Sequence, residues 1–239
     1  DFEIEFPENP NAGRLQFYYG RFMFRDRKYD EALEALEKTN GYDLEPKDER
    51  ELNFMLGYLY FKKKDYDKAK QAFGLVKDGT DDNAMTATYY YGYIAYEQGK
   101  YTEALKEFNR VKSDKRFKNT VPMYISQIYL MQGKYDDAIA NAQAMISDTM
   151  QDGLALQLAE AYFLKNDFKN AALWFDKVSA SGMNQHYMYE AGYSQLNANE
   201  YAEAAKTFSG ITVKQDSLGQ NVAYNMGIAY LNSGEKNKA

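Results

Sequence analysis

A small residue, an aromatic residue nine positions later and an alanine twelve positions later recur along this chain at intervals close to 34 residues. The pattern starts at seven positions, the last of which has Lys236 in place of the aromatic residue: Gly20, Gly57, Gly92, Ser126, Ala159, Gly192 and Gly227. The intervals between these positions are 37, 35, 34, 33, 33 and 35 residues, a variation that differences in loop length explain. A period of this size is typical of solenoids, in which each repeat buries its apolar face against its neighbours. We therefore expect one array of stacked repeats.

Each repeat is predicted to be a pair of α-helices. The first half of a repeat, such as Tyr89–Tyr96, is too densely apolar for an amphipathic strand and suits a helix that is buried on two sides. The second half carries apolar residues three and four positions apart, as at Tyr101, Leu105 and Phe108, which places them on one helical stripe. A short turn such as the one at Gly99 separates the halves, so neighbouring helices should be antiparallel.

The recurring residues have a packing explanation. A glycine in the first helix and an alanine in the second allow the two helices to approach closely, and a larger side chain there would cost about 1 to 3 kcal/mol. The aromatic residue that starts the second helix should fill the space beside the turn, and a recurring phenylalanine, as at Phe73 and Phe208, should seal the space between repeats. The structural positions with the clearest pattern are Gly20, Ala32, Gly57, Tyr66, Ala69, Gly92, Tyr101, Ala104, Gly192, Tyr201 and Ala204.

This combination of period and residue types resembles the tetratricopeptide repeat family. The resemblance implies an all-α fold, a right-handed α-solenoid of antiparallel helix pairs with about six full units and a partial one. It predicts a single array over residues 1–239, in which 1–12 are the end of a preceding unit or a linker. The expected units are 13–46, 47–81, 82–117, 118–148, 149–181, 182–215 and the partial 216–239.

The first dozen residues carry a second resemblance. Phe2, Phe6, Pro7 and Pro10 form a phrase similar to one in tetratricopeptide proteins of the bacterial cell envelope. This resemblance implies a periplasmic or outer-membrane-associated protein that begins before Asp1. A cytoplasmic location stays open, because a chain without cysteine fits either compartment.

The family geometry implies that the first helices line the concave side of the superhelix. Positions three residues before and four residues after each small residue should be mainly core, whereas the position directly after it should face a ligand. Tyrosines at such positions are favoured at interfaces, because they combine a large contact area with few rotatable bonds. The candidate groove residues are Arg21, Tyr58, Tyr93, Gln127, Glu160 and Tyr193. We expect them to bind a peptide or a segment of another protein.

The sequence argues against several classes of function. The chain has one histidine, His186, no cysteine and no glycine-rich phosphate loop, so we expect no enzyme, no cofactor and no metal site. Residues 78–83 lack the alternating oxygen ligands of a calcium loop and are predicted to be a turn with a helix N-cap. The net charge of -6 disfavours nucleic acid, and the longest apolar stretch has about eight residues where a membrane span needs about 20.

The expected function is therefore a non-enzymatic interaction scaffold, and the resemblance of the first dozen residues implies that it belongs to a bacterial envelope assembly. Three alternatives stay open at this point. The chain could be the recognition module of a larger enzyme or transporter, its aromatic groove could bind carbohydrate or cell wall, and its exposed array ends could self-associate. The sequence does not identify the partner.

Overall fold

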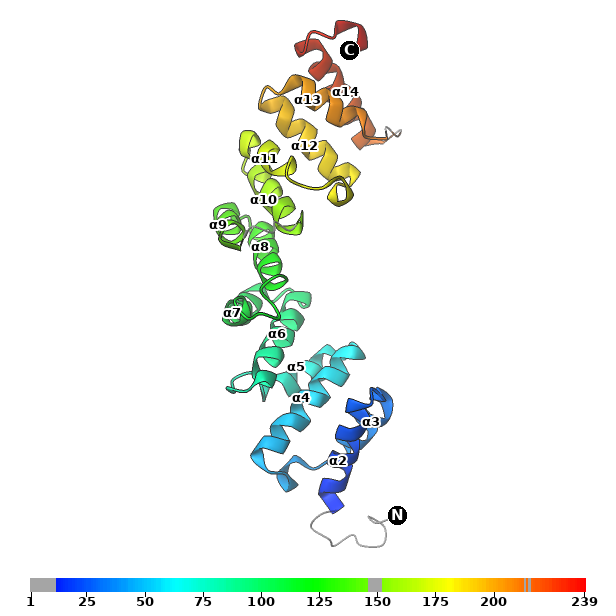
Figure 1. Ribbon diagram of the computed structural model, residues 1–239, viewed down its shortest axis with the longest axis vertical. Coiled ribbons are helices and arrows are strands. Elements are labelled where there is room, and N and C mark those ends of the chain that lie inside the picture. Colours follow the sequence, from blue (N-terminus) through cyan, green and yellow to red (C-terminus); the bar gives the residue numbers. More distant parts are fainter. Residues whose placement is uncertain (1–11, 146–151, 213, 215) are drawn as a thin grey trace. The chain divides into compact units, whose positions relative to one another are not determined.

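The structure is a computed structural model that describes residues 12–145, 152–212, 214 and 216–239. These residues form thirteen α-helices and three short 3-10 helices and contain no β-strand, so the predicted all-α class is confirmed (Figure 1). The chain divides into two compact units, Asp1–Lys118 and Asn119–Ala239. Each unit is a stack of helix pairs.

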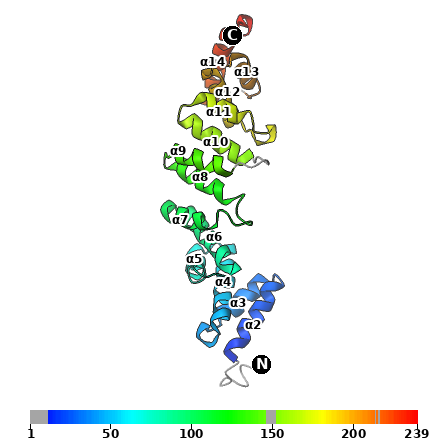
Figure 2. The ribbon, with the colours of Figure 1, turned by 60° about the vertical axis from the view of Figure 1, so that its left-hand side comes forward.

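Unit 1 contains three helix pairs. Their bounds are α2 (Ala12–Arg25) with α3 (Tyr29–Glu37), α4 (Pro46–Lys62) with α5 (Tyr66–Gly74), and α6 (Asp82–Glu97) with α7 (Tyr101–Val111). A 3-10 helix, η1 (Gly41–Asp43), precedes α4. Each second helix packs on the next first helix, and the first helices α2, α4 and α6 also contact one another in sequence (Figure 2).

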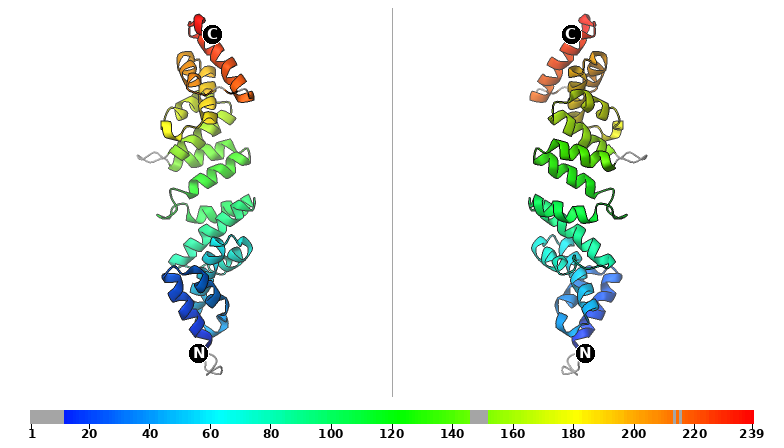
Figure 3. Two further views of the ribbon diagram at one scale, coloured as in Figure 1. Left: turned by 90° about the vertical axis from the view of Figure 1, so that its right-hand side faces the viewer. Right: turned by 90° about the vertical axis from the view of Figure 1, so that its left-hand side faces the viewer.

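Unit 2 contains three further pairs and a final first helix. Their bounds are α8 (Val121–Met131) with α9 (Tyr135–Met145), α10 (Asp152–Leu164) with α11 (Phe168–Phe175), α12 (Gln185–Asn197) with α13 (Tyr201–Ser209), and α14 (Ser217–Asn232). The 3-10 helices η2 (Ala180–Gly182) and η3 (Lys236–Lys238) lie before α12 and after α14. Each first helix of this unit contacts the next one, from α8 to α10, α12 and α14. Helix α14, coloured orange to red, is the last α-helix of the unit (Figure 3). We call the surface that α8, α10 and α12 share the first-helix face of unit 2.

The helices begin and end where local chemistry allows. Asp81 caps α6 by accepting a hydrogen bond from the backbone N–H of Ala84 at 2.9 Å, so residues 78–83 form the predicted turn and N-cap. Left-handed backbone conformations follow the first helices at Gly99, Gly133, Asn166 and Asn199, residue types that tolerate this geometry. Arg27 and Lys64 adopt the same conformation, which their residue types did not indicate.

The predicted glycine contacts are present at Gly20, Gly57, Gly92 and Gly192, each of which faces a large residue of the paired helix. A Cβ atom built on Gly57 would lie 2.7 Å from the ring of Phe73, and one on Gly92 would lie 3.1 Å from the ring of Phe108. Gly20 stands in the same relation to Leu36, at 2.6 Å. The recurring spacing therefore pairs a residue without a side chain with a residue that fills its space. Six alanines of the pattern are buried, whereas the seventh, Ala239, is exposed; the buried ones are Ala32, Ala69, Ala104, Ala138, Ala171 and Ala204.

The fourth repeat departs from this scheme in a compensated way. Ser126 replaces the glycine, and Ala142 stands where other repeats carry phenylalanine or leucine. The Ser126 hydroxyl is fully buried and accepts a hydrogen bond from Asn141 Nδ2 at 2.9 Å. The larger side chain in the first helix is thus matched by a smaller one in the second, and its polar atom is satisfied.

Candidate functional site

The candidate groove residue of α2, Arg21, is held by acidic residues of the next first helix. Its Nη1 lies 3.3 Å from Glu51 and 3.8 Å from Asp48, both in α4. The guanidinium also lies 4.9 Å from the ring centroid of Tyr18. Arg21 therefore joins two neighbouring repeats, and it remains partly exposed for a ligand.

The candidate groove tyrosines are half-buried and pack against the preceding repeat. Tyr58 lies edge-on to Phe24 at 5.6 Å between ring centroids and contacts Tyr29 at 6.0 Å. Tyr193 repeats this arrangement against Phe163 and Phe168, and Tyr93 contacts Phe61 at 5.7 Å. Burial, followed by the charge of Tyr29, raises the pKa of the Tyr58 phenol. These tyrosines thus contribute to packing between repeats as well as to the surface.

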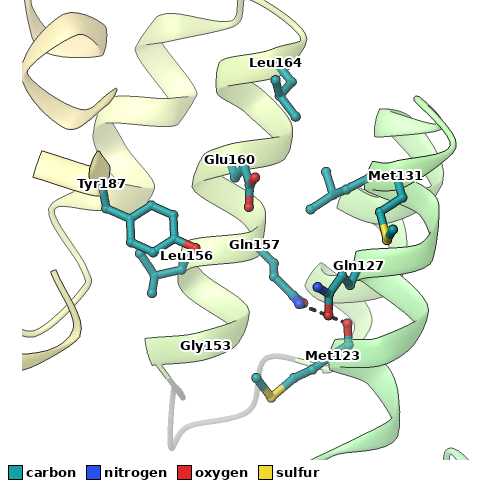
Figure 4. A pocket seen from close by; sticks show the side chains of 10 residues that line it. Met123, Gln127, Met131, Gly153, Leu156, Gln157, Glu160, Leu164 and Tyr187 are labelled. Atoms are coloured by element: carbon teal, nitrogen blue, oxygen red, sulfur yellow. Dashed lines mark hydrogen bonds between the residues drawn. The ribbon is translucent and has the colours of Figure 1, made fainter. Parts of the chain in front are cut away.

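The other two candidates, Gln127 and Glu160, come together in a pocket on the first-helix face of unit 2 (Figure 4). The pocket has a volume of about 470 Å³. Its walls come from α8, α10 and the first turn of α12. The lining residues are Met123, Gln127, Leu130, Met131, Gly153, Leu156, Gln157, Glu160, Leu164 and Tyr187. Apolar walls with a few polar groups are typical of a binding pocket.

Two exposed apolar side chains, Met131 and Leu164, lie on the rim of this pocket at the ends of α8 and α10. Met131 is 58% exposed and Leu164 is 39% exposed. Both occupy the position five residues after the small residue of their repeat. The other repeats place polar side chains there: Arg25, Lys62, Glu97, Asn197 and Asn232. Apolar exposure at this position is therefore confined to the two repeats that build the pocket.

The pocket also contains an incompletely satisfied amide. Gln157 Nε2 donates a hydrogen bond to the backbone carbonyl of Met123 at 2.9 Å, which links α10 to α8 (Figure 4). The Oε1 atom of Gln157 is buried and has no hydrogen-bond partner among the described residues. A buried acceptor without a donor is unfavourable, so this atom is available to a ligand group that carries an N–H or O–H.

A pair of carboxylates lies beside the pocket. Glu160 lines it, and Glu190, one turn after Tyr187 on α12, lies within range of the Glu160 charge. Burial and the negative charge of Glu160 raise the pKa of Glu190 to about 7. Burial also raises the pKa of Glu160, against a smaller opposing effect of His186. Glu190 Oε1 lies 3.2 Å from Nε2 of the exposed His186, whereas its Oε2 is buried without a partner among the described residues.

The repeat pattern predicted Gln127 and Glu160 but not the other residues of this candidate site. It assigned Met123 and Leu156 mainly to the core and did not single out Met131, Leu164, Gln157 or Glu190. A comparison of equivalent positions between repeats could have found Met131 and Leu164, because the other repeats carry polar residues at this position. The pairing of Glu190 with Glu160 could not be found in this way, since it depends on how α12 packs on α10.

In the described part of the chain, no group of three or more His, Asp or Glu side chains is arranged to hold a metal ion. None of the described helices combines the length and apolarity that a membrane span requires.

Comparisons with known proteins agree with the repeat pattern. A family model described as tetratricopeptide repeat matches residues 23–83, 54–117 and 125–185, which together cover more than half of the chain. No curated protein sequence matches the chain significantly.

Several solved structures share the fold. The C-terminal part of a TPR repeat-containing protein from Cytophaga hutchinsonii aligns with a TM-score of 0.61 at 15% identity, over 92% of this chain and 81% of that one. A signal-transduction ATPase from Pyrococcus horikoshii with a tetratricopeptide repeat sensor gives 0.59 at 17% identity, over 98% and 41%. The apo form of RapI gives 0.56 at 11% identity, over 95% and 99%. At these identities the likeness concerns the fold alone.

Proposed function

Because the chain belongs to the tetratricopeptide repeat family, we propose that it is a non-enzymatic scaffold that binds a segment of another protein on the first-helix face of unit 2. Tetratricopeptide repeats in general are protein–protein interaction modules. Stacked helices supply a large contact surface without a reactive centre. The partner would be a peptide or a protein segment rather than a small molecule, because the pocket opens onto a surface that several helices share.

The exposure of Met131 and Leu164 is the observation that carries this proposal. Large apolar side chains that are exposed together mark interaction surfaces on soluble proteins. Here they replace the polar residues of the equivalent positions in the other repeats, so the fold does not require them. Their removal from water on binding would contribute affinity, and about 25 cal/mol for each Å² of apolar surface is typical.

The pocket below this rim adds shape and polar contacts. Leu156 and Met123 form an apolar floor, and the flexible thioether of methionine adapts to irregular partners. The Gln127 side chain is exposed at the edge, where it can form hydrogen bonds with a peptide backbone. We therefore assign the pocket to one anchor side chain of the partner and the rim to its neighbours.

The candidate groove residues Arg21, Tyr58, Tyr93 and Tyr193 are proposed as further contact residues. Each keeps part of its side chain exposed while the rest packs within its own unit. Because they also support repeat packing, a loss of binding in their alanine variants would have two causes. They are therefore less suited than the pocket to a first test.

We also propose that the binding partner belongs to a bacterial envelope assembly. The support is the resemblance of the first dozen residues to envelope proteins, and residues 1–11 lie outside those that the structure describes. Fractionation of cells that express the native gene should find the protein in the periplasm or with the outer membrane. Recovery in the cytoplasmic fraction alone would contradict this location.

Site-specific photo-crosslinking tests the binding face. A photo-reactive phenylalanine analogue at position 127, in the full-length protein expressed in its native cells, should give discrete crosslinks to other proteins. The matched control places the same analogue at Ala140, an exposed position of the second helix α9. Equal crosslinking from both positions, or crosslinks from position 140 alone, would contradict a binding site on the first-helix face.

A further inference from the structure

We propose that the pocket of unit 2 accepts a lysine or arginine side chain of the partner, with Glu160 as its direct contact and Glu190 as a second counter-charge behind it. This inference rests on the proposed function and specifies the chemistry of the anchor side chain. It follows from the pocket, from an unpartnered buried carboxylate oxygen and from the charge of the site.

The position of Glu190 is the first argument. It stands two residues before the small residue Gly192, and the equivalent residues in the repeats on either side are Gln157 and Asn225. Each of those amides donates to the preceding first helix, Gln157 to the carbonyl of Met123 and Asn225 to the hydroxyl of Tyr189. An ionised carboxylate has no proton to donate, so Glu190 cannot make this contact once it has lost its proton.

The second argument is the burial of Glu190, which makes ionisation of its carboxyl group unfavourable. The residue is 5% exposed, and its Oε2 atom has no hydrogen-bond partner among the described residues. A buried carboxylate is stable when a cation or several donors surround it. The described groups that face it are Glu160 on α10, which is also acidic, and His186 and Tyr187 on its own helix. Ionisation of Glu160 and Glu190 therefore places negative charge in this site without a facing cation among the described residues except His186, and a cationic ligand would neutralise it.

Glu160 connects this charge to the pocket. It lines the cavity, and among the described residues no hydrogen bond or ion pair involves its carboxylate. Figure 4 shows it on α10 between Gln157 and Leu164, with the ring of Tyr187 on the neighbouring helix. A cation that enters the pocket would thus meet Glu160 first, with Glu190 near enough to add attraction.

The rest of the pocket fits the stem of a long basic side chain. Lysine and arginine carry three or four methylene groups that pack on apolar surfaces while the charged end makes polar contacts. Met123 and Leu156 supply such a surface. The unpartnered Oε1 of Gln157 can accept a further hydrogen bond from the ammonium or guanidinium group.

The test compares two probe peptides on the full chain. One is an acetylated and amidated pentapeptide with a central lysine between alanines and terminal leucines, and the other carries norleucine in place of lysine. Binding is followed by NMR of ¹³C-labelled methionine methyl groups. Met123 and Met131 report on the pocket, and Met85, exposed on α6 of unit 1, serves as the internal control.

We expect the lysine peptide to shift the Met123 and Met131 signals and to leave Met85 unchanged. Norleucine should weaken binding about tenfold, since a charge-assisted hydrogen bond is lost. Glu160→Gln should weaken the lysine peptide to a similar extent and Glu190→Gln to a smaller one. Glu203→Gln, which removes an exposed charge from α13, should have little effect.

Equal binding of the two peptides, or lysine binding that is unchanged in both Glu160→Gln and Glu190→Gln, would overturn the inference. So would the absence of any shift at Met123 and Met131 at roughly millimolar peptide. Photo-crosslinking from position 127 separates this failure from that of the proposed function. If the crosslinks persist at full yield in Glu160→Gln, the face binds a protein segment but not through a basic anchor.

Discussion

Gly192 in α12 lies directly against the ring of Phe208 in α13, and a Cβ atom on Gly192 would lie 2.8 Å from that ring. Phe208 is fully buried and belongs to the core that α13 and α14 share. Gly227 holds the equivalent position in α14, but no atom of another residue lies within 4 Å of its Cβ position. Phe208 stands sixteen residues after Gly192, whereas the corresponding position after Gly227 is beyond Ala239, so within residues 1–239 packing requires the first glycine and not the second.

These two glycines predict stability changes of opposite sign. Gly192→Ala should lower the free energy of unfolding by about 1 to 3 kcal/mol, because Phe208 must move to admit the methyl group. In a polypeptide of residues 1–239, Gly227→Ala should raise it by about 0.5 to 1 kcal/mol through higher helix propensity. Urea unfolding followed by circular dichroism measures both, and Trp174, the single tryptophan, reports on unit 2. Changes of the same sign in both variants would contradict the packing explanation.

The packing of the Tyr193 ring predicts how two substitutions at this position change stability. Its ring contacts Phe163 and Phe168 of the preceding repeat at 6.0 and 5.6 Å between centroids. Tyr193→Ala should therefore cost about 1 to 3 kcal/mol in unfolding free energy, whereas Tyr193→Phe, which keeps the ring, should cost little. Thermal unfolding of the two variants provides the measurement. An alanine variant as stable as the parent would place this ring on a free surface.

The buried carboxylate of Glu107 in unit 1 predicts that the loss of one charged side chain lowers stability clearly. Glu107 is 2% exposed and forms ion pairs with Lys77 at 3.0 Å and with Arg110 at 2.6 Å. Glu107→Ala removes this buried carboxylate while Asp78 still pairs with both cations, so we expect a loss of about 1 to 3 kcal/mol in unfolding free energy. Glu34→Ala removes a carboxylate from the exposed pair with Lys38 and should change stability little. Similar chemical denaturation midpoints for the two variants would contradict a structural role of Glu107.

Glu190 predicts a pH dependence with a definite sign. Its pKa in the folded state is about 7, above the ordinary value of 4.5, because of burial and the charge of Glu160. As pH rises from 4.5 to 7, the unfolded chain releases this proton before the folded chain does, and stability falls. Its contribution is thus fully present below pH 4.5 and lost above pH 7.

Glu190→Gln removes this titration. The variant should match the parent in melting temperature near pH 4.5 and exceed it increasingly up to about pH 8. Glu203→Gln provides the comparison for an exposed carboxylate. A parent and variant whose melting temperatures differ by the same amount at every pH would show that Glu190 ionises normally.

The fold was predictable because its determinants repeat. Gly57 and Phe73 belong to a spacing that occurs in several units, so one chain already contains several examples of the same contact. The left-handed turns at Gly99 and Asn166 were predictable from residue type, whereas those at Arg27 and Lys64 are imposed by the helix pairs around them. Local sequence carries no mark of such a constraint.

The candidate site was predictable only in part, because it depends on what differs between repeats. Gln127 and Glu160 followed from their position after the small residue. The burial of Glu190 against α10 follows from tertiary packing, and its missing partner appears only when the atoms around it are known. The rim residues Met131 and Leu164 differ from the polar residues at the equivalent positions of the other repeats. Such positions vary between repeats in any case, so this difference alone does not mark a site.

The most direct test of the proposed binding face is the yield of photo-crosslinked partner from position 127 in the variant Met131→Ser/Leu164→Ser. Both side chains are exposed, so this variant should unfold at nearly the same urea concentration as the parent. Leu173→Ser is the matched control, since Leu173 is 52% exposed on the second helix α11 of the same unit. We predict that the crosslink yield falls at least about tenfold in the double variant, the effect of about 1.4 kcal/mol of lost apolar contact, and stays unchanged in the control. An undiminished yield in a folded double variant would contradict the assignment of the first-helix face of unit 2 as the binding surface.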